Sequence, residues 1–467
     1  MEYIENRTFD EIKIGDSASI VRTLTQEDIE LFAVMSGDVN PAHLDVEYAR
    51  SDLFKRIVAH GMWGGSLISA VLGTKLPGPG AIYLGQDLRF RRPVSLGDTI
   101  TVTVTVTQKD EERHRVTLDC TCTNQKGEVV ITGTAEVIAP TEKVKRPRVV
   151  LPDVLLYDRG VHLDRLIAST KGLEPIRVAV VHPVDRNALL GAVDAATAEL
   201  IVPVLIGPEA RIRAAAEALD VDLSPYTIIP TEHSHAAAER AVALARAGEV
   251  EALMRGSLAV DELMGAVLAL GTGLRTGRRM SHVWMLDVPT YARPLFLTDA
   301  VLNIYPDLQD KRDIVQNAID LALVLGIEVP KVAILSAVET VDSKIQSTLE
   351  AAALCKMADR GQIRGGLVDG PLAFDDAVSP EAARARGVVS PVAGQADILV
   401  VPDLESGNML GKQLEYLAEA EGAGIVLGAR VPIILPTRAE SALSRTASCA
   451  LGLLLARSQQ KGKAQPS

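Results

Sequence analysis

The chain has 467 residues, too many for one ordinary domain, so two or three domains are expected. Its net charge of -12 argues against a nucleic-acid partner, and no stretch approaches the ~18 apolar residues that a membrane span needs. The acidic N-terminus lacks the apolar core of a signal peptide, and the four cysteines are scattered, so the composition favours a cytoplasmic protein with reduced thiols.

The first stretch that carries chemistry is residues 36–45, in which a carboxylate, an amide and an imidazole follow one another as Asp38, Asn40 and His43. Asn40-Pro41 predicts a bend, because proline pushes the residue before it out of the α region. Asp38 and His43 then flank the bend and can form an acid–base pair. On spacing alone, an Asx-type turn with an unrelated histidine explains the pattern about equally well.

The motifs that follow give this stretch a context. His60-Gly61-Met62 leads into residues 63–72, which are apolar on nearly every side and predict a buried helix. Three further motifs come in order, Leu-Pro-Gly-Pro-Gly at residues 76–80, Phe-Arg-Arg-Pro at 90–93 and Gly-Asp at 97–98. The ordered series, over roughly residues 8–138, resembles the MaoC-like (R)-specific enoyl-CoA hydratases. The resemblance implies an α+β hot-dog fold, in which a curved antiparallel sheet wraps round one long helix.

Carried over residue by residue, the resemblance implies that Asp38 activates water and that His43 shares the proton transfer. The amide of Gly61 would bind the thioester oxygen, since a helix N-terminus leaves amide donors free and carries a positive dipole end. Asn40 and Ser69 are the expected substrate-binding residues of this part. Ser69 matches a polar position that lines the pocket in some relatives, and a serine that packs between helices explains it equally well.

The rest of the first third predicts strands. Valine and isoleucine alternate with threonine over residues 100–107, which is typical of a strand with one buried face, and residues 116–122 and 129–131 continue the pattern. Residues 140–150 are charged and flanked by proline, and are interpreted as a linker. Domains at 1–139 and 151–467 are therefore predicted.

Beyond the linker, short β-branched runs alternate with alanine-rich helical segments such as 211–219 and 236–247. The runs lie at residues 178–181, 204–206, 227–229, 332–335, 398–401, 425–427 and 433–435. Alternation of this kind predicts a largely parallel α/β sheet in two lobes with a cleft between them. Gly271, Gly273 and Gly277 miss the dinucleotide spacing by one residue, and no phosphate-binding loop motif occurs, so neither NAD nor ATP is predicted.

Polar residues gather where the predicted strands end, which is where open α/β sheets place ligands. Each could be a helix cap, but five clusters in register favour binding. The candidate binding residues are Asp299, Asn303, Ser336, Asp403 and Asn408. The strings around them, over roughly residues 150–458, resemble the phosphate acetyl/butyryltransferase family. That resemblance implies a two-lobed fold of the isocitrate dehydrogenase type and the reaction acyl-CoA + phosphate ⇌ acyl-phosphate + CoA.

The family's catalytic Ser-Arg dipeptide falls on Thr437-Arg438. Arginine suits the task because its fork binds phosphate through two parallel hydrogen bonds and stays protonated. Acetyl-type enzymes carry an aspartate where this chain has Ser444 and an arginine where it has Tyr416. The butyryl-type branch shows similar changes, so a butyryl-type enzyme is favoured, and the base that takes the thiol proton is unassigned.

Together the two resemblances predict a bifunctional enzyme of acyl-CoA metabolism. Its partners would be CoA thioesters and inorganic phosphate, with no metal, cofactor, nucleic acid or membrane, and the chain would form at least a dimer. Two alternatives concern the first domain, which could bind acyl-CoA or dimerise without chemistry, or could hydrolyse thioesters, since one fold hosts many activities.

Overall fold

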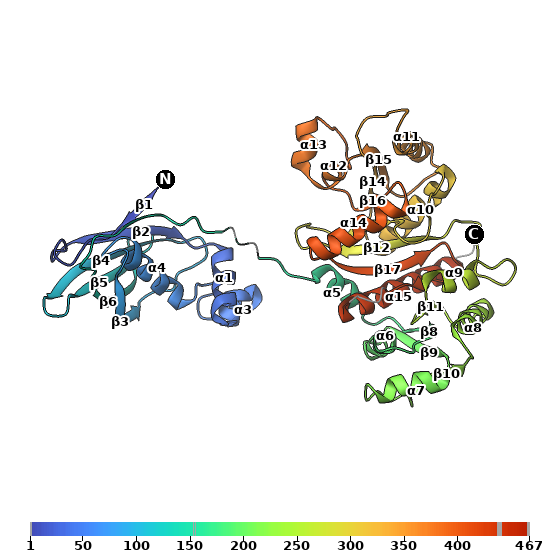
Figure 1. The fold of residues 1–467 in the computed structure, drawn as a ribbon, viewed down its shortest axis with the longest axis horizontal. Helices are drawn as coiled ribbons and strands as arrows, with labels where there is room; N and C mark the ends of the chain where they lie inside the picture. The colour runs from blue at the N-terminus through green and yellow to red at the C-terminus, as the bar shows by residue number, and fades with distance from the viewer. Residues whose placement is uncertain (1, 153, 155, 437–440, 465–467) are drawn as a thin grey trace. The chain divides into compact units, whose positions relative to one another are not determined.

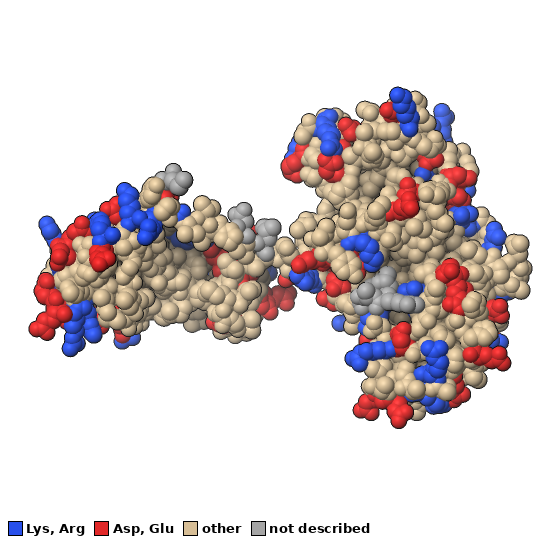
Figure 2. Space-filling view, viewed as in Figure 1, with Lys and Arg blue, Asp and Glu red and all other residues tan. Residues whose placement is uncertain are grey.

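The computed structural model describes residues 2–152, 154, 156–436 and 441–464. The chain divides into two compact units, Met1–Leu156 and Tyr157–Ser467 (Figure 1). On the face of each unit shown in Figure 2, lysine and arginine are interspersed with aspartate and glutamate rather than gathered into one field. None of the described helices is long and apolar enough to cross a membrane.

The first unit is built on a five-stranded antiparallel sheet in the order β2-β4-β5-β6-β3. Its strands are β2 (Ser17–Thr23), β3 (Ile82–Phe90), β4 (Thr99–Asp110), β5 (Arg115–Thr123) and β6 (Val129–Ile138). Its helices are α1 (Gln26–Ser36), α2 (Pro41–Leu44), α3 (Val46–Ser51) and α4 (Gly61–Thr74).

Helix α4 packs against this sheet and closes the core of the unit. The alternating side chains of β4 confirm the predicted pattern, because Ile100, Val102, Val104 and Val106 are all buried. Gly64 lets α4 approach the sheet closely, since a Cβ at this position would lie 2.3 Å from Cδ1 of Ile131. The unit has the predicted hot-dog fold.

Strand β7 (Lys145–Pro147) pairs antiparallel with β1 (Tyr3–Glu5). It lies inside the segment 140–150 that the sequence predicts as a linker, and the pairing holds it to the first unit. The two compact units divide after Leu156. The domain boundaries at residues 139 and 151 stay a prediction.

The second unit contains an eleven-stranded sheet in the order β10-β9-β8-β11-β18-β17-β12-β13-β16-β14-β15. The strands are β8 (Ile176–Val181), β9 (Ile201–Gly207), β10 (Thr227–Pro230), β11 (Ala252–Arg255), β12 (Ser281–Asp287), β13 (Leu295–Thr298), β14 (Lys331–Leu335), β15 (Leu367–Leu372), β16 (Ile398–Val400), β17 (Glu421–Leu427) and β18 (Ile433–Ile434). The helices are α5 (Val161–Ala168), α6 (Arg186–Thr197), α7 (Glu209–Glu217), α8 (Ser234–Ala247), α9 (Val260–Leu268), α10 (Leu308–Val324), α11 (Gln346–Asp359), α12 (Phe374–Val378), α13 (Pro380–Arg386), α14 (Leu404–Leu417) and α15 (Ala442–Ala464).

Both ends of this sheet are parallel, and its middle is antiparallel. Strand β12 runs antiparallel to β13 and β17, and β17 runs antiparallel to β18. Figure 1 shows the two parallel ends as two lobes with β12 and β17 between them, as the predicted α/β architecture requires. Helix α15 packs on β17 and β18, and Gly452 allows the approach because a Cβ there would lie 2.7 Å from Cδ1 of Ile434.

Candidate active sites

In the first unit, the connection between α1 and α2 forms the bend predicted from Asn40-Pro41. Helix α1 ends at Gly37, whose φ of 74° is left-handed and favours glycine. The side-chain oxygen of Asn40 accepts a hydrogen bond from the Ala42 N–H at 3.1 Å, and Pro41 occupies the first helical position. Asp38 therefore lies in the connection between α1 and α2, and His43 lies on α2.

His43 is held in one tautomer by the backbone. Its Nδ1 lies 2.8 Å from the carbonyl oxygen of Val58, so Nδ1–H donates and Nε2 keeps its lone pair. The buried ring of His60 lies 4.0 Å from the His43 ring, centroid to centroid, and its Nε2 donates to the carbonyl of Asp38 at 2.9 Å. His60 belongs to the His60-Gly61-Met62 motif, but no role for its side chain was predicted from the sequence.

The side-chain ligand atoms of Asp38, His43 and His60 all lie within 4.8 Å of one another. This spacing suits proton transfer through one water molecule, and it is also short enough for three ligands of a divalent cation. Asp38 is exposed, His43 is half-buried and His60 is buried, so the group spans the boundary between solvent and core.

A pocket of about 310 Å³ opens beside these residues, and its lining includes His43, His60 and Gly61. Most of its other walls are apolar, among them Phe54, Phe90, Val94 and Ile131. Gly61 is the first residue of α4, and no side chain caps this helix, so in the described structure its N–H is free to face the pocket.

Two expected substrate-binding residues of this unit lie away from the pocket lining. Ser69 is exposed on α4 and is not among the residues that line the pocket. Asn40 is also exposed, and its described contact is the cap on α2. Their roles in binding stay predictions.

In the second unit, a pocket of about 350 Å³ lies where α14 ends, β17 begins and α15 begins. Its lining includes Tyr416 and Ser444, the two positions at which the sequence departs from the acetyl-type pattern. Trp284 of β12 and Glu421 of β17 also line this pocket. Thr437 and Arg438 lie outside the described residues, in the segment that joins β18 to α15.

Glu421 receives two hydroxyl groups in this pocket. The hydroxyls of Ser441 and Ser444 each donate to Oε2 of Glu421 at 2.6 Å. Ser441 also caps α15, because its Oγ accepts the N–H of Ser444 at 3.1 Å. The carboxylate therefore sits at the positive end of a helix of 23 residues. Sequence reasoning missed Glu421, since its partners lie at least twenty residues away along the chain.

Asp299 and Asn303 form a buried pair, as their spacing of four residues allows. Nδ2 of Asn303 donates to Oδ2 of Asp299 at 2.5 Å and to the carbonyl of Met280 at 2.9 Å. Burial raises the pKa of the Asp299 carboxyl, while hydrogen bonds from the N–H groups of Val301 and Leu302 oppose the shift. Neither Asp299 nor Asn303 lines the pocket that contains Glu421.

The remaining predicted binding residues make local contacts. Ser336 is buried, with its hydroxyl 2.8 Å from that of Ser347. Asp403 caps α14 by accepting the N–H of Ser406 at 2.8 Å, which is the capping role that the sequence left open. Nδ2 of Asn408 lies 3.3 Å from the carbonyl oxygen of Ala300. None of the three lines the pocket that contains Glu421, and their binding roles stay predictions.

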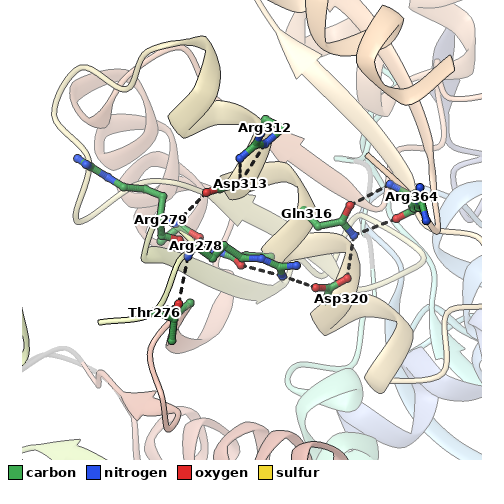
Figure 3. A network of polar contacts seen from close by, with 11 residues as sticks. Thr276, Arg278, Arg279, Arg312, Asp313, Gln316, Asp320 and Arg364 are labelled. Atoms are coloured by element: carbon green, nitrogen blue, oxygen red, sulfur yellow. Dashed lines mark hydrogen bonds and ion pairs between the residues drawn. The ribbon is translucent and has the colours of Figure 1, made fainter. Parts of the chain in front are cut away.

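Figure 3 shows a network of basic and acidic side chains between the segment before β12 and helix α10. Arg278 pairs with Asp320 at 2.5 Å, the backbone N–H of Arg279 donates to Asp313 at 2.9 Å, and Arg312 pairs with Asp313 at 2.7 Å. Arg278 and the backbone of Arg279 therefore hold the segment before β12 to α10, while Arg312 pairs with its neighbour on α10.

Both units match known families. The description "Phosphate acetyl/butaryl transferase" matches residues 235–451, and "MaoC like domain" matches residues 13–126. Over 293 residues the chain is 59% identical to a phosphate acetyltransferase of Rhizobium meliloti, covering 63% of this chain and 93% of the relative.

Two further proteins match the second unit. A phosphate butyryltransferase of Clostridium beijerinckii is 39% identical over 295 residues, covering 63% of this chain and 98% of the relative. The crystal structure of a branched-chain phosphotransacylase from Enterococcus faecalis is 28% identical with a TM-score of 0.53, covering 60% of this chain and 99% of that one.

Proposed function

The chain belongs to the phosphate acetyl/butyryltransferase family, and on that premise we propose that it is a bifunctional enzyme with a separate reaction in each unit. The second unit transfers an acyl group between CoA and inorganic phosphate. The first unit adds water to a 2-enoyl-CoA to form the (R)-3-hydroxyacyl-CoA. Neither reaction as written needs a metal or a redox cofactor, and we place both in the cytoplasm.

The hydratase proposal rests on one observation, the convergence of Asp38, His43 and His60 beside an apolar pocket with a free helix N-terminus. Water bound between Asp38 and Nε2 of His43 would give up a proton as its oxygen bonds to C3 of the enoyl group. Negative charge then develops on the thioester oxygen, where the N–H of Gly61 can stabilise it until C2 is protonated. The apolar walls would hold the acyl chain.

The two alternatives for the first unit make different products. A binding or dimerising module would leave crotonyl-CoA unchanged, and a thioesterase would release free CoA. Hydration would instead consume the double bond and keep the thioester. Incubating the full chain with crotonyl-CoA and following both the double bond and free thiol therefore separates the three activities.

The transferase proposal rests on the family and on the site at the start of α15. Thr437 and Arg438 stand a few residues before α15, and the positive dipole end of this helix favours an anion such as phosphate. The arginine fork would hold the phosphate for attack on the thioester carbonyl. Phosphate-dependent release of CoA from acetyl-CoA and butyryl-CoA tests the activity.

We expect kcat/KM for acetyl-CoA to be at least as high as for butyryl-CoA. Tyr416 and Ser444 favoured the butyryl type in the sequence, but the acetyltransferase relative is 59% identical and the butyryltransferase relative 39%. Extra methylenes in an apolar pocket change specificity by only ~1–3 kcal/mol each, so both thioesters should react. The measurement is phosphate-dependent CoA release for chains of two to six carbons; a clear preference for butyryl-CoA would restore the sequence-based interpretation.

A further expectation is that the chain forms at least a dimer. Strand β3 ends the sheet of the first unit and leaves one edge unpaired, and Ile82, Tyr83 and Leu84 on it are 57%, 42% and 42% exposed. An open strand edge that carries exposed apolar side chains favours association. Light scattering at micromolar concentration should give at least twice the monomer mass, and a monomer would reject the proposal.

A further inference from the structure

Acyl transfer requires a group that handles the thiol proton. When CoA attacks an acyl phosphate, its sulfur must lose a proton, and a thiol with a pKa of about 8.5 is mostly protonated at pH 7. We propose that the carboxylate of Glu421 takes this proton when acyl-CoA forms and returns it to sulfur when acyl-CoA is cleaved. The inference rests on the acyl transfer proposed above.

Glu421 is the carboxylate in its pocket that no described cation neutralises. The other two glutamates in the lining are each held in an ion pair, Glu415 with Lys412 at 2.5 Å and Glu419 with Arg159. Both described partners of Glu421 are neutral hydroxyls. Glu421 is therefore a positioned carboxylate outside the ion pairs of its pocket, and a positioned carboxylate can act as a general base.

The two hydroxyls fix the orientation of this carboxylate. Ser441 and Ser444 both donate to Oε2, and in the described part of the chain no donor contacts Oε1. One oxygen is therefore anchored to the start of α15, and the other is left for the pocket. In the sequence, Ser441 stands three residues after Arg438, the residue expected to hold phosphate.

The charged surroundings of Glu421 come from four elements. Asp287 of β12 lies opposite it in the strand register, with one carboxylate oxygen bonded to the N–H of His162 on α5. Arg159 precedes α5, and the paired Glu415 and Glu419 stand at and after the end of α14. The N-terminal end of α15, where Ser441 and Ser444 donate to Glu421, completes the set.

The proposed step conserves atoms and charge. The sulfur of CoA forms a bond to the acyl carbon as its proton passes to Oε1 of Glu421. The bond between that carbon and the bridging oxygen breaks, and its electron pair leaves with phosphate. In the reverse direction the protonated Glu421 gives its proton to the departing sulfur.

The test is Glu421→Gln in the full chain, assayed for acyl-CoA formation from acetyl phosphate and CoA. The amide still accepts a hydroxyl hydrogen bond but takes no proton, so we expect a loss of about 10²-fold at pH 7. Because the variant depends on spontaneous thiolate, its rate should rise about tenfold per pH unit up to the thiol pKa near 8.5. The deficit relative to the wild type should therefore shrink as pH rises.

Two companion variants separate this role from a purely structural one. Glu421→Asp keeps the carboxylate, so it should retain more activity than the glutamine variant and the pH profile of the wild type. Glu419→Gln removes an ion-paired carboxylate from the same pocket, and any loss it causes should not depend on pH. An unchanged rate in Glu421→Gln, or a deficit that stays constant with pH, would overturn the inference.

The wild-type arm distinguishes failure of the inference from failure of the proposed function. A wild type that forms no acyl-CoA from acetyl phosphate overturns both. A wild type that is active beside an equally active Glu421→Gln overturns only the role of Glu421. If the glutamine variant does not fold, Glu421→Ala decides: a loss in this variant that shrinks as pH rises supports the role, and a wild-type rate or a loss that stays constant with pH overturns it.

Discussion

Replacing Asp38 by asparagine, or His43 by glutamine, is expected to lower hydration of crotonyl-CoA by roughly 10²–10⁴-fold and to leave acyl transfer unchanged. Asparagine keeps the shape of Asp38 but takes no proton from water. Glutamine removes the lone pair that the contact between Nδ1 of His43 and Val58 leaves on Nε2. Acyl transfer should survive because both residues lie in the first compact unit.

The measurement is loss of the enoyl double bond, with phosphate-dependent CoA release in the same preparation as the folding control. Glu47→Gln serves as the matched variant, since it removes an exposed carboxylate from the neighbouring helix α3. It should hydrate at the wild-type rate. Hydration that survives both Asp38→Asn and His43→Gln within a few-fold would reject the assignment, and loss of acyl transfer in either would show that the two units are not independent.

Strands were predictable from the sequence where their buried positions carry apolar side chains in an alternating or a continuous pattern. Strand β4 alternates buried and half-buried residues, and β8 is a buried β-branched run, so both were found. Strand β3 is exposed along almost its whole length, which leaves no period of two. Strand β12 is buried throughout but contains Ser281, His282 and Asp287, whose polarity conceals the burial.

The site residues also differ in how far their contacts reach along the chain, and only local contacts were predicted from the sequence. Asp38 and His43 were predictable as a pair because a single bend brings them together. His60 joins them only through a contact across 22 residues, and Glu421 meets Ser444 across 23. Contacts of that span depend on how α4 packs on its sheet and where α15 begins relative to β17. The cap formed by Asp403, by contrast, joins residues three apart in the chain, and such a local contact can be predicted from the sequence.

Arg438→Lys is expected to lower acyl transfer by about 10²–10³-fold while hydration continues at the wild-type rate. The attacking phosphate is a polyanion, and the transition state adds charge on the thioester oxygen and on the departing sulfur. A guanidinium relieves that charge through two parallel hydrogen bonds and keeps its proton at any working pH. Lysine keeps the positive charge but cannot donate two parallel hydrogen bonds to phosphate. The loss of activity therefore measures the contribution of the bidentate contact rather than that of charge alone.

Two comparisons sharpen this expectation. Thr437→Ala should cost less, because a hydroxyl contributes one neutral hydrogen bond of about 0.5–1.5 kcal/mol. Arg430→Lys is the matched control, since Arg430 is an exposed arginine eight residues earlier that should tolerate the exchange. Phosphate-dependent CoA release is measured for all three variants. Turnover in Arg438→Lys equal to that of Arg430→Lys would refute the role of Arg438. A loss in kcat with little change in KM for phosphate would place its contribution in the transition state, because an interaction made equally in the ground state changes KM and not kcat.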